Sequence, residues 1–238
     1  MELRNEIILG DCLTVLPTLP QARMIFADPP DNLGVKYADG VTDKRDDYID
    51  WLCTLWSSVY AHQPAVFWFS HYYKHTIPLL RRIPTFGGYV VRQFTWRYTF
   101  GQHQEVDCGN GYRPILRFSA PGTIWHTNDI RIPSARLEKY GDKRANPEGR
   151  VPDDVWDFPR ICGTFKERRA WHPNQHPEAL IERMIRMSTR PADLVIDLFA
   201  GTGTVNRVCQ RLGRSCIGIE ISPPYVAKIR EELKTHAS

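Results

Sequence analysis

Two segments far apart in the chain each combine an apolar run with a sharp turn, and they constrain the fold most. In the first, the apolar run 24–27 is followed by Asp28-Pro29-Pro30-Asp31. The run predicts a short buried strand, and two consecutive prolines fix φ twice and remove two backbone donors. Because α/β sheets bind ligands at the carboxyl ends of their strands, this stiff turn offers a carboxylate and carbonyl acceptors there. A group that donates two hydrogen bonds, such as the exocyclic amine of a base, suits such acceptors.

The second segment is Asp197-Leu-Phe-Ala-Gly-Thr-Gly-Thr204, which follows the apolar run 194–196. Gly201 and Gly203 let the backbone approach a ligand at the start of a helix. Glu220 ends the next expected strand, about 20 residues later, where an acidic side chain suits ribose hydroxyls. Taken alone, a glycine pair is a weak signal that also fits tight packing or an NAD-type site.

The chain has 238 residues, of which 42% are hydrophobic, enough for one domain spanning 1–238 with a sizeable core. Apolar periodicity predicts strands and helices in alternation, which favours an α/β fold with a doubly wound, mostly parallel sheet. The expected strands are 3–9, 22–27, 65–69, 88–99, 114–118, 193–198 and 215–221. The expected longer helices are 48–61, 178–188, 204–212 and 223–234.

A basic stretch interrupts this alternation. The net charge is +4, which permits a polyanionic partner without proving one. We expect an insert at about 120–160, where apolar runs disappear and charged, Gly and Pro residues dominate. A solvated, partly flexible loop explains such a stretch, and so does a surface that follows DNA phosphates. The candidate DNA-binding residues there are Arg131, Arg136, Lys139, Lys143 and Arg144.

The six cysteines are scattered and form no Cys-x-x-Cys pair, so we expect no metal site. They are typical of reduced, buried thiols in a cytosolic protein. The chain has no apolar run of membrane-spanning length, and its first residues are too charged for a signal peptide, so we expect no membrane association.

Taken together, these segments resemble the amino-group DNA methyltransferases of the β arrangement, in which the Asp-Pro-Pro motif precedes the S-adenosyl-L-methionine (AdoMet) motif. Gly10-Asp11-Cys12, the stretch 154–160, the stretch 172–183 and Gly218-Ile-Glu-Ile221 resemble further family segments in the same order. The resemblance covers nearly the whole chain. It implies a circularly permuted, Rossmann-like class I methyltransferase fold, AdoMet as cofactor and double-stranded DNA as partner. An enzyme of phage, prophage or orphan type would look like this, so the resemblance implies the cytoplasm of a bacterial or phage-infected host cell.

The resemblance also implies roles for individual residues. A base is flipped out of the duplex, and Asp28 with the Pro29 and Pro30 carbonyls accepts its amine protons. Asp11 and Cys12 would hold the cofactor adenine, and Glu220 and Ile221 its ribose. The backbone amides of Gly201 and Gly203 would approach the methionine end, and Asn174 and Gln175 would line its carboxylate. The other expected cofactor-binding residues are Phe199, Ala200, Thr202 and Thr204.

Asp31 departs from the family pattern, which usually has an aromatic residue there that stacks on the flipped base. Such stacking is worth about 1–3 kcal/mol. Tyr37, in a loop at 33–46 that we expect to be disordered without DNA, is the candidate substitute. A second departure is His176, where the family usually has Lys.

Several functional alternatives stay open at this stage. Asp rather than Ser before Pro-Pro favours adenine-N6 over cytosine-N4 methylation. Asp31 motivates a non-catalytic protein that binds DNA or AdoMet, and the related scaffolds include RNA and protein-amide methyltransferases. The short insert predicts a short recognition site or help from a second subunit, possible in a homodimer. The chain carries no nuclease signature, so a role in restriction-modification would need a separate partner.

Overall fold

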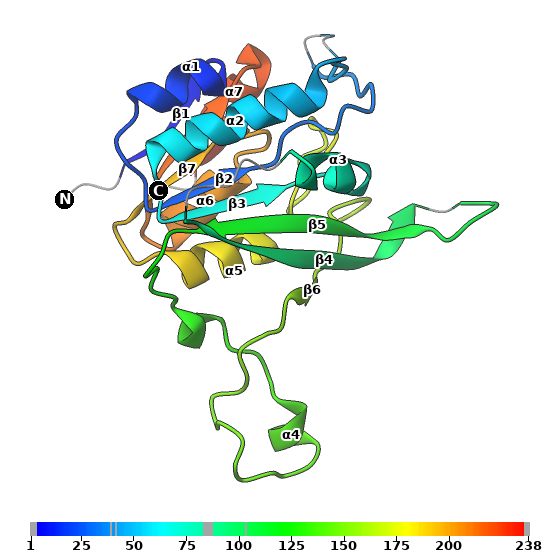
Figure 1. Ribbon diagram of the computed structural model, residues 1–238, viewed down its shortest axis with the longest axis vertical. Coiled ribbons are helices and arrows are strands. Elements are labelled where there is room, and N and C mark those ends of the chain that lie inside the picture. The colour runs from blue at the N-terminus through cyan, green and yellow to red at the C-terminus, as the bar shows by residue number, and fades with distance from the viewer. Residues whose placement is uncertain (1–3, 39, 41, 83–87, 103, 236–238) are drawn as a thin grey trace.

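The computed structural model describes residues 4–38, 40, 42–82, 88–102 and 104–235, which form one sheet covered by helices (Figure 1). Its strand order is β1-β8-β7-β2-β3-β5-β4-β6. The strands are β1 (Asn5–Leu9), β2 (Met24–Ala27), β3 (Val66–Ser70), β4 (Val90–Gln102), β5 (Asn110–Ser119), β6 (Val155–Asp157), β7 (Leu194–Asp197) and β8 (Ser215–Glu220). Only β5 runs antiparallel to its neighbours, so the predicted mostly parallel α/β sheet is confirmed.

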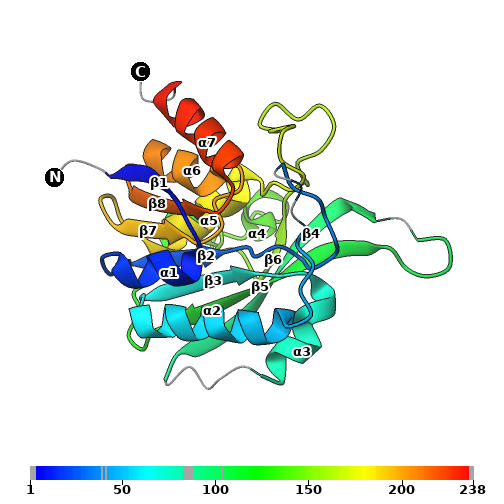
Figure 2. The same ribbon diagram turned by 90° about the horizontal axis from the view of Figure 1, so that it is seen from above.

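Helices cover both faces of this sheet (Figure 2). One face carries α1 (Cys12–Val15), α2 (Tyr48–His62) and α3 (Thr76–Leu80), and the other carries α5 (Glu178–Ser188), α6 (Thr204–Arg211) and α7 (Pro223–Thr235). Three short 3-10 turns, η1 (Leu16–Thr18), η2 (Tyr73–His75) and η3 (Thr127–Ile130), complete the body. Side chains alternate along β2, where Ile25 packs into the first core and Phe26 into the second. This two-sided burial explains why the central strands read as continuous apolar runs.

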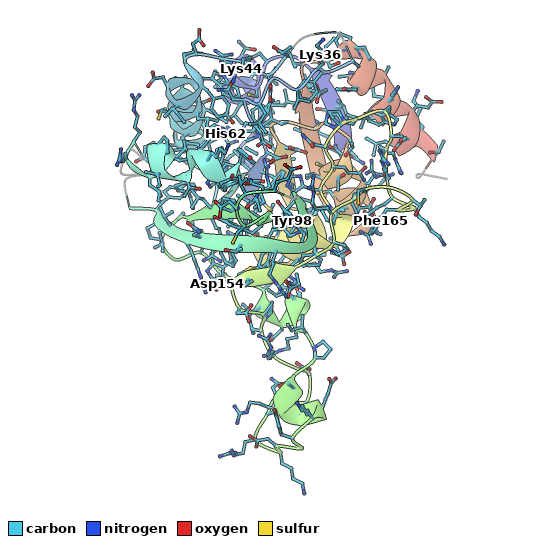
Figure 3. All side chains as sticks on the ribbon, turned by 90° about the vertical axis from the view of Figure 1, so that its right-hand side faces the viewer. Lys36, Lys44, His62, Tyr98, Asp154 and Phe165 are labelled. Atoms are coloured by element: carbon cyan, nitrogen blue, oxygen red, sulfur yellow. The ribbon has the colours of Figure 1, made fainter. Side chains whose placement is uncertain are left out.

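The expected insert is shorter than predicted. Residues 155–157 form β6 and pair with β4, and Trp156 is buried against Trp68 and Phe94. Ile130 also belongs to this core. The segment that leaves the body is 131–150, which we call the arm; it contains α4 (Ala135–Glu138) and hangs below the sheet (Figure 3). The boundary at 160 was wrong because an isolated tryptophan among charged residues gives no strand pattern.

The neck of the arm is an isolated antiparallel bridge between Ile132 and Arg150. Beside it, Gly149 has φ +92°, and a Cβ there would lie 2.2 Å from the Ile132 carbonyl oxygen. Glycine is therefore required where the two backbone segments of the neck approach each other.

In the part of the chain that the structure describes, no helix is long and apolar enough to cross a membrane. The same residues hold no group of three or more His, Cys, Asp or Glu side chains arranged to bind a metal ion.

Gly203 allows a close approach between the start of α6 and α7. Its φ is +72°, and an added Cβ would lie 2.5 Å from Ile229 Cγ2. Gly213 has a similar φ of +69° with nothing within 4 Å of that position. An alanine at Gly203 would therefore suffer both backbone strain and a steric clash, whereas an alanine at Gly213 would suffer backbone strain alone.

We expect Gly203→Ala to lower the free energy of unfolding by about 2–4 kcal/mol, because overpacking adds to the left-handed backbone cost. Gly213→Ala should lose only the backbone cost of about 1–2 kcal/mol. Urea unfolding of both variants measures the difference. Equal losses would contradict the packing role assigned to Gly203.

Candidate active site

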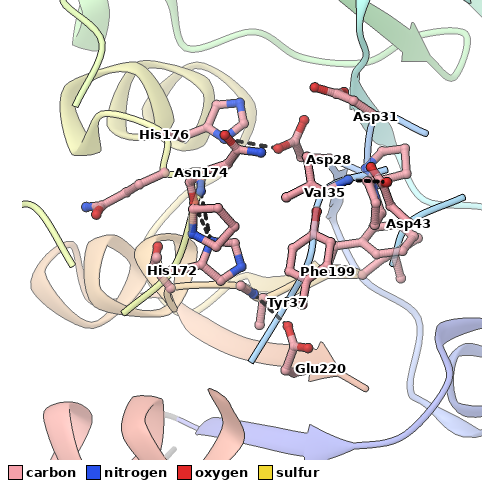
Figure 4. A pocket seen from close by; sticks show the side chains of 18 of the residues that line it. Asp28, Asp31, Val35, Tyr37, Asp43, His172, Asn174, His176, Phe199 and Glu220 are labelled. Atoms are coloured by element: carbon pink, nitrogen blue, oxygen red, sulfur yellow. Dashed lines mark hydrogen bonds and ion pairs between the residues drawn. The ribbon is translucent and has the colours of Figure 1, made fainter. Parts of the chain in front are cut away.

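Both sequence segments line one cavity of about 490 Å³ at the carboxyl edge of the parallel strands (Figure 4). β1, β8, β7 and β2 end there, so Asp11, Glu220, Asp197 and Asp28 come together, as parallel strands require. The cavity volume lies within the usual range for sites of small molecules. Since β5 is antiparallel, its first half reaches the same edge and brings Arg113 into the cavity.

On one side of the cavity, hydrogen bonds hold Glu220 in a fixed position. Its Oε2 accepts from Gly201 N at 2.9 Å and its Oε1 from Ser222 N at 2.9 Å. Asp11 caps α1 by accepting from Leu13 N at 2.8 Å. These carboxylates therefore lie in the same cavity in defined orientations before any ligand binds.

Most of the predicted cofactor residues line this side. They are Asp11, Cys12, Asn174, Gln175, Phe199, Ala200, Gly201, Thr202, Thr204, Glu220 and Ile221. The exception is Gly203, which faces Ile229 of α7 instead. Gln175 lines the cavity, but its amide is already hydrogen-bonded within the protein. It accepts from Arg169 N and donates to Glu167 O, and these bonds hold the loop that carries it.

On the other side lies the Asp28 carboxylate, held by Arg113. Arg113 Nη2 donates to Asp28 Oδ1 at 2.7 Å. The same guanidinium binds Asp31 through both carboxylate oxygens, at 2.9 and 2.8 Å, and donates from Nε to Ser70 Oγ at 2.7 Å. His176 Nδ1 lies 3.4 Å from Asp28 Oδ2, so both oxygens of Asp28 have a partner.

These neighbours determine the charge of Asp28. Burial raises the pKa of this carboxyl, but Arg113 and His176, with hydrogen bonds from Ser70 and Arg113, outweigh burial and hold the pKa below its usual value. Burial lowers the pKa of His176 more than Asp28 raises it. At neutral pH the site therefore holds an ionised Asp28 beside a neutral imidazole.

The two prolines differ in what their carbonyls do. Tyr48, at the start of α2, donates its hydroxyl to the Pro30 carbonyl at 2.6 Å. The Pro30 carbonyl therefore already has one donor, and acceptance of the amine protons by the two carbonyls stays a prediction. His75 Nε2 donates to the Asp31 carbonyl at 2.8 Å, which fixes the end of the turn.

Tyr37, the candidate base-stacking residue, lines the cavity and packs against other aromatic rings. Its ring packs against His172 at 5.9 Å and Tyr225 at 6.5 Å between centroids, on the same side as Glu220 (Figure 4). Asp43 organises this loop by accepting from three consecutive backbone N–H groups, those of Leu33, Gly34 and Val35. Residues 39 and 41 lie outside the described part, and disorder of the loop without DNA stays a prediction.

Tyr72, Trp96 and Tyr98 are among the aromatic residues that line the cavity, which Arg113 also lines. Arg160 lies over the Tyr98 ring at 5.3 Å. Sequence reasoning assigned no site role to these aromatic residues or to Arg113. Each lies on β4 or β5, or shortly after β3, and reaches the site only through sheet pairing. A basic residue opposite the Asp-Pro-Pro turn has no local sequence signal.

The five candidate DNA-binding residues lie in the arm in three different states. Arg131 donates to Asn128 and to the Gly149 carbonyl at the neck, so it is structural. Arg136 and Arg144 share the carboxylate of Asp142. Lys139 and Lys143 are exposed and are the cations best placed for a polyanion.

Asp197 is a further carboxyl at this edge, with only 2% of its surface exposed. Burial raises its pKa to about 8, against about 3.9 in an unfolded chain. The folded state therefore favours the protonated form. The resulting stabilisation is complete below about pH 4 and is lost as the pH rises through about 8.

We expect the free energy of unfolding to fall between pH 5 and pH 8.5 more steeply in the wild type than in Asp197→Asn, because asparagine stays neutral. Urea unfolding at several pH values measures both slopes. Parallel slopes would show that Asp197 does not carry this pH dependence.

Comparison with known proteins agrees with this geometry. Residues 22–231 match the family model described as DNA methylase, of the N6 and N4 methyltransferases. The chain is 34% identical to the type II methyltransferase M.HpaI of Haemophilus parainfluenzae over 96% of its length and 74% of that protein. It is 33% identical to the DNA adenine methyltransferase YhdJ of Escherichia coli K12 over 93% of its length and 80% of that protein.

Solved structures share the fold. The cytosine-N4-specific PvuII DNA methyltransferase superposes with a TM-score of 0.73 at 20% identity, covering 98% of this chain and 92% of that one. The M1.HpyAVI–SAM complex gives 0.64 at 19% identity, covering 95% and 98%. From the family match, the two relatives and the cavity that joins the two motifs, this chain belongs to the amino-group (N6/N4) DNA methyltransferases.

Proposed function

We propose that this protein methylates the N6 amine of adenine at a short, specific site in double-stranded DNA, with AdoMet as cofactor. The observation that carries the proposal is the single cavity at the sheet edge. It is lined by the Asp28-Pro29-Pro30 turn on one side and by Gly201 and Glu220 on the other. A methyl donor and an acceptor amine can therefore meet in one enclosed space, which supplies proximity and orientation.

The cofactor side of the cavity fits AdoMet. Glu220 presents a carboxylate suited to ribose hydroxyls, held by two backbone N–H groups. Gly201 has φ +52° and lines the cavity without a side chain. Phe199, packed edge-to-face with Trp51, gives an aromatic surface suited to a purine ring. When bound there, AdoMet supplies an electrophilic methyl group.

On the amine side, the ionised Asp28 carboxylate and the Pro29 carbonyl accept hydrogen bonds from the two N–H groups of the exocyclic amine. This pairing orients the nitrogen lone pair away from the acceptors and towards the cofactor side. Positive charge develops on the nitrogen during methylation, and Asp28 stabilises it electrostatically. Because the pKa of Asp28 is lowered, the released proton passes on to water rather than resting on this carboxylate.

Adenine is favoured over cytosine by the Asp28-Pro-Pro sequence and by the likeness to YhdJ, named a DNA adenine methyltransferase. Cytosine-N4 is the second candidate, favoured by the structural likeness to the PvuII enzyme. Both amines present the same two donors, so product analysis is what separates the two bases. The site specificity, a homodimer and a phage or orphan origin stay predictions.

To test the proposal, labelled AdoMet and unmethylated genomic DNA are incubated with the protein, and the DNA is digested to nucleosides for mass spectrometry. N6-methyladenine is the expected product. N4-methylcytosine would keep the mechanism and change the base. Unmethylated DNA together with intact AdoMet binding would overturn the proposal in favour of a non-catalytic protein, or of RNA or protein as substrate.

We expect Asp28→Asn to lower kcat by at least about a hundredfold, because the amide loses the negative charge that stabilises the amine nitrogen. AdoMet binding, measured by calorimetry, should be retained, since Asp28 lies on the amine side of the cavity. Glu231→Gln, an exposed position on α7, is the control and should keep full activity. A fully active Asp28→Asn enzyme is incompatible with the proposed role.

We expect Lys139→Ala/Lys143→Ala to weaken binding to all DNA sequences alike. The slope of log K against log salt concentration should fall by about one for each lost phosphate contact. Lys234→Ala, near the end of α7, is the matched control. Fluorescence anisotropy at several salt concentrations measures the slopes, and an unchanged slope in the double variant would show that the arm does not follow phosphates.

A further inference from the structure

Three charged side chains meet at the amine side of the cavity in an arrangement that the Asp-Pro-Pro motif alone does not explain. Arg113 bridges Asp28 and Asp31, and these two carboxylates lie only three residues apart on the same turn. We propose that Arg113 and Asp31 form a charge-compensated positioning pair that holds Asp28 in its reactive orientation and sets the net charge of the three side chains together. This inference rests on the proposed methyl transfer and assigns two further residues to it.

The hydrogen bonds of Arg113 leave it little freedom. Nη1 and Nη2 clamp Asp31 in a bidentate pair, Nη2 reaches Asp28, and Nε is anchored on Ser70. The planar guanidinium fork suits this geometry, whereas a lysine ammonium does not reproduce it. Asp28 Oδ1 is therefore held by a group that is itself fixed from the turn and from β3.

The sum of charges explains why Asp31 accompanies Arg113. Two carboxylates and one guanidinium carry a net charge of −1, the charge of Asp28 alone. Without Asp31, Arg113 would cancel the charge of Asp28 and weaken its attraction for a positive amine nitrogen. Without Arg113, two carboxylates would repel each other in a poorly solvated site.

Limited solvent access strengthens the electrostatic interactions among these three charges, because water screens them less. The side chains of Arg113, Asp28 and Asp31 are exposed by only 14%, 21% and 13%. Burial works against the charged form of Arg113, but the two carboxylates raise its pKa above the usual value. Other titratable groups also act on Asp28 or are influenced by it from surrounding elements, namely Tyr37, Tyr48, His71, His172, His176 and Asp197.

A double-mutant cycle with Asp31→Asn, Arg113→Met and the two combined tests the pair. Each single variant should lose about tenfold or more in kcat. Asp31→Asn leaves Arg113 to cancel the charge of Asp28, and Arg113→Met leaves two carboxylates that repel each other. The combined variant restores one carboxylate in a neutral setting. It should be about tenfold or more better than the product of the single losses, and more active than Arg113→Met alone.

The pH profile of kcat/KM shows whether Arg113 and Asp31 act on Asp28 or only stabilise the local structure. In Arg113→Met, burial and the second carboxylate raise the pKa of Asp28, so activity should be lost at a higher pH than in the wild type. In Asp31→Asn the acid limb should not move up. In the combined variant it should lie below that of Arg113→Met, because Asp31 no longer repels Asp28.

The control removes a more exposed Arg–Asp ion pair elsewhere on the sheet. Arg92 of β4 donates to Asp154 at 3.0 Å, away from the cavity. Arg92→Met and Asp154→Asn should leave kcat and the acid limb unchanged. If the methionine variant does not fold, Arg113→Gln, which is also neutral, replaces it in the cycle. Arg113→Lys keeps the charge but not the planar guanidinium fork. It should lose activity without the full shift of the acid limb.

The outcomes distinguish this inference from the proposed function. If the wild type methylates DNA but the single effects simply multiply and every acid limb coincides, Arg113 and Asp31 are a structural clip and the inference is overturned. A combined variant no more active than Arg113→Met also overturns it. A wild type that binds AdoMet but methylates no nucleoside overturns the proposed function itself.

Discussion

The pairing of β2 with β7 is the constraint on which the rest of the structure depends. It places Ile25 beside Ile196 and Phe26 beside Asp197, although about 170 residues separate them in the chain. Both strands are buried on both faces, so their backbone groups must pair with neighbouring strands, and a slip by one residue would exchange the two faces. This one register brings the Asp28 turn and the glycine-containing turn to the same edge.

The sequence predicted those parts of the fold and site that follow from local pattern. Apolar runs with abrupt ends defined β2, β7 and β8, and the rule that parallel strands share an edge then placed Asp28 beside Glu220. Arg113 could not be found in this way, because its position depends on β5 running antiparallel to β3. Trp156 was missed for a related reason, since β6 is three residues long and is recognisable only by its pairing with β4.

The position of the positive charge beside Asp28 differs from the family pattern. His176 stands where the family usually has lysine, and burial lowers the pKa of its imidazole, so no permanent charge lies on that side. On the opposite side, Arg113 supplies a permanent charge from a different strand. The departures at 31 and 176 are therefore connected through Asp28 rather than independent losses.

The same reasoning bears on whether Asp31 indicates an inactive protein. An unpaired carboxylate in the base site would repel Asp28 and raise its pKa, which would damage the motif. Asp31 is instead bound by Arg113 through both oxygens, and the pKa of Asp28 stays low. A buried pair of this kind costs desolvation energy and is poor evidence of stability alone. Its retention beside the Asp-Pro-Pro turn is more readily explained by a requirement to keep Asp28 ionised and oriented than by folding.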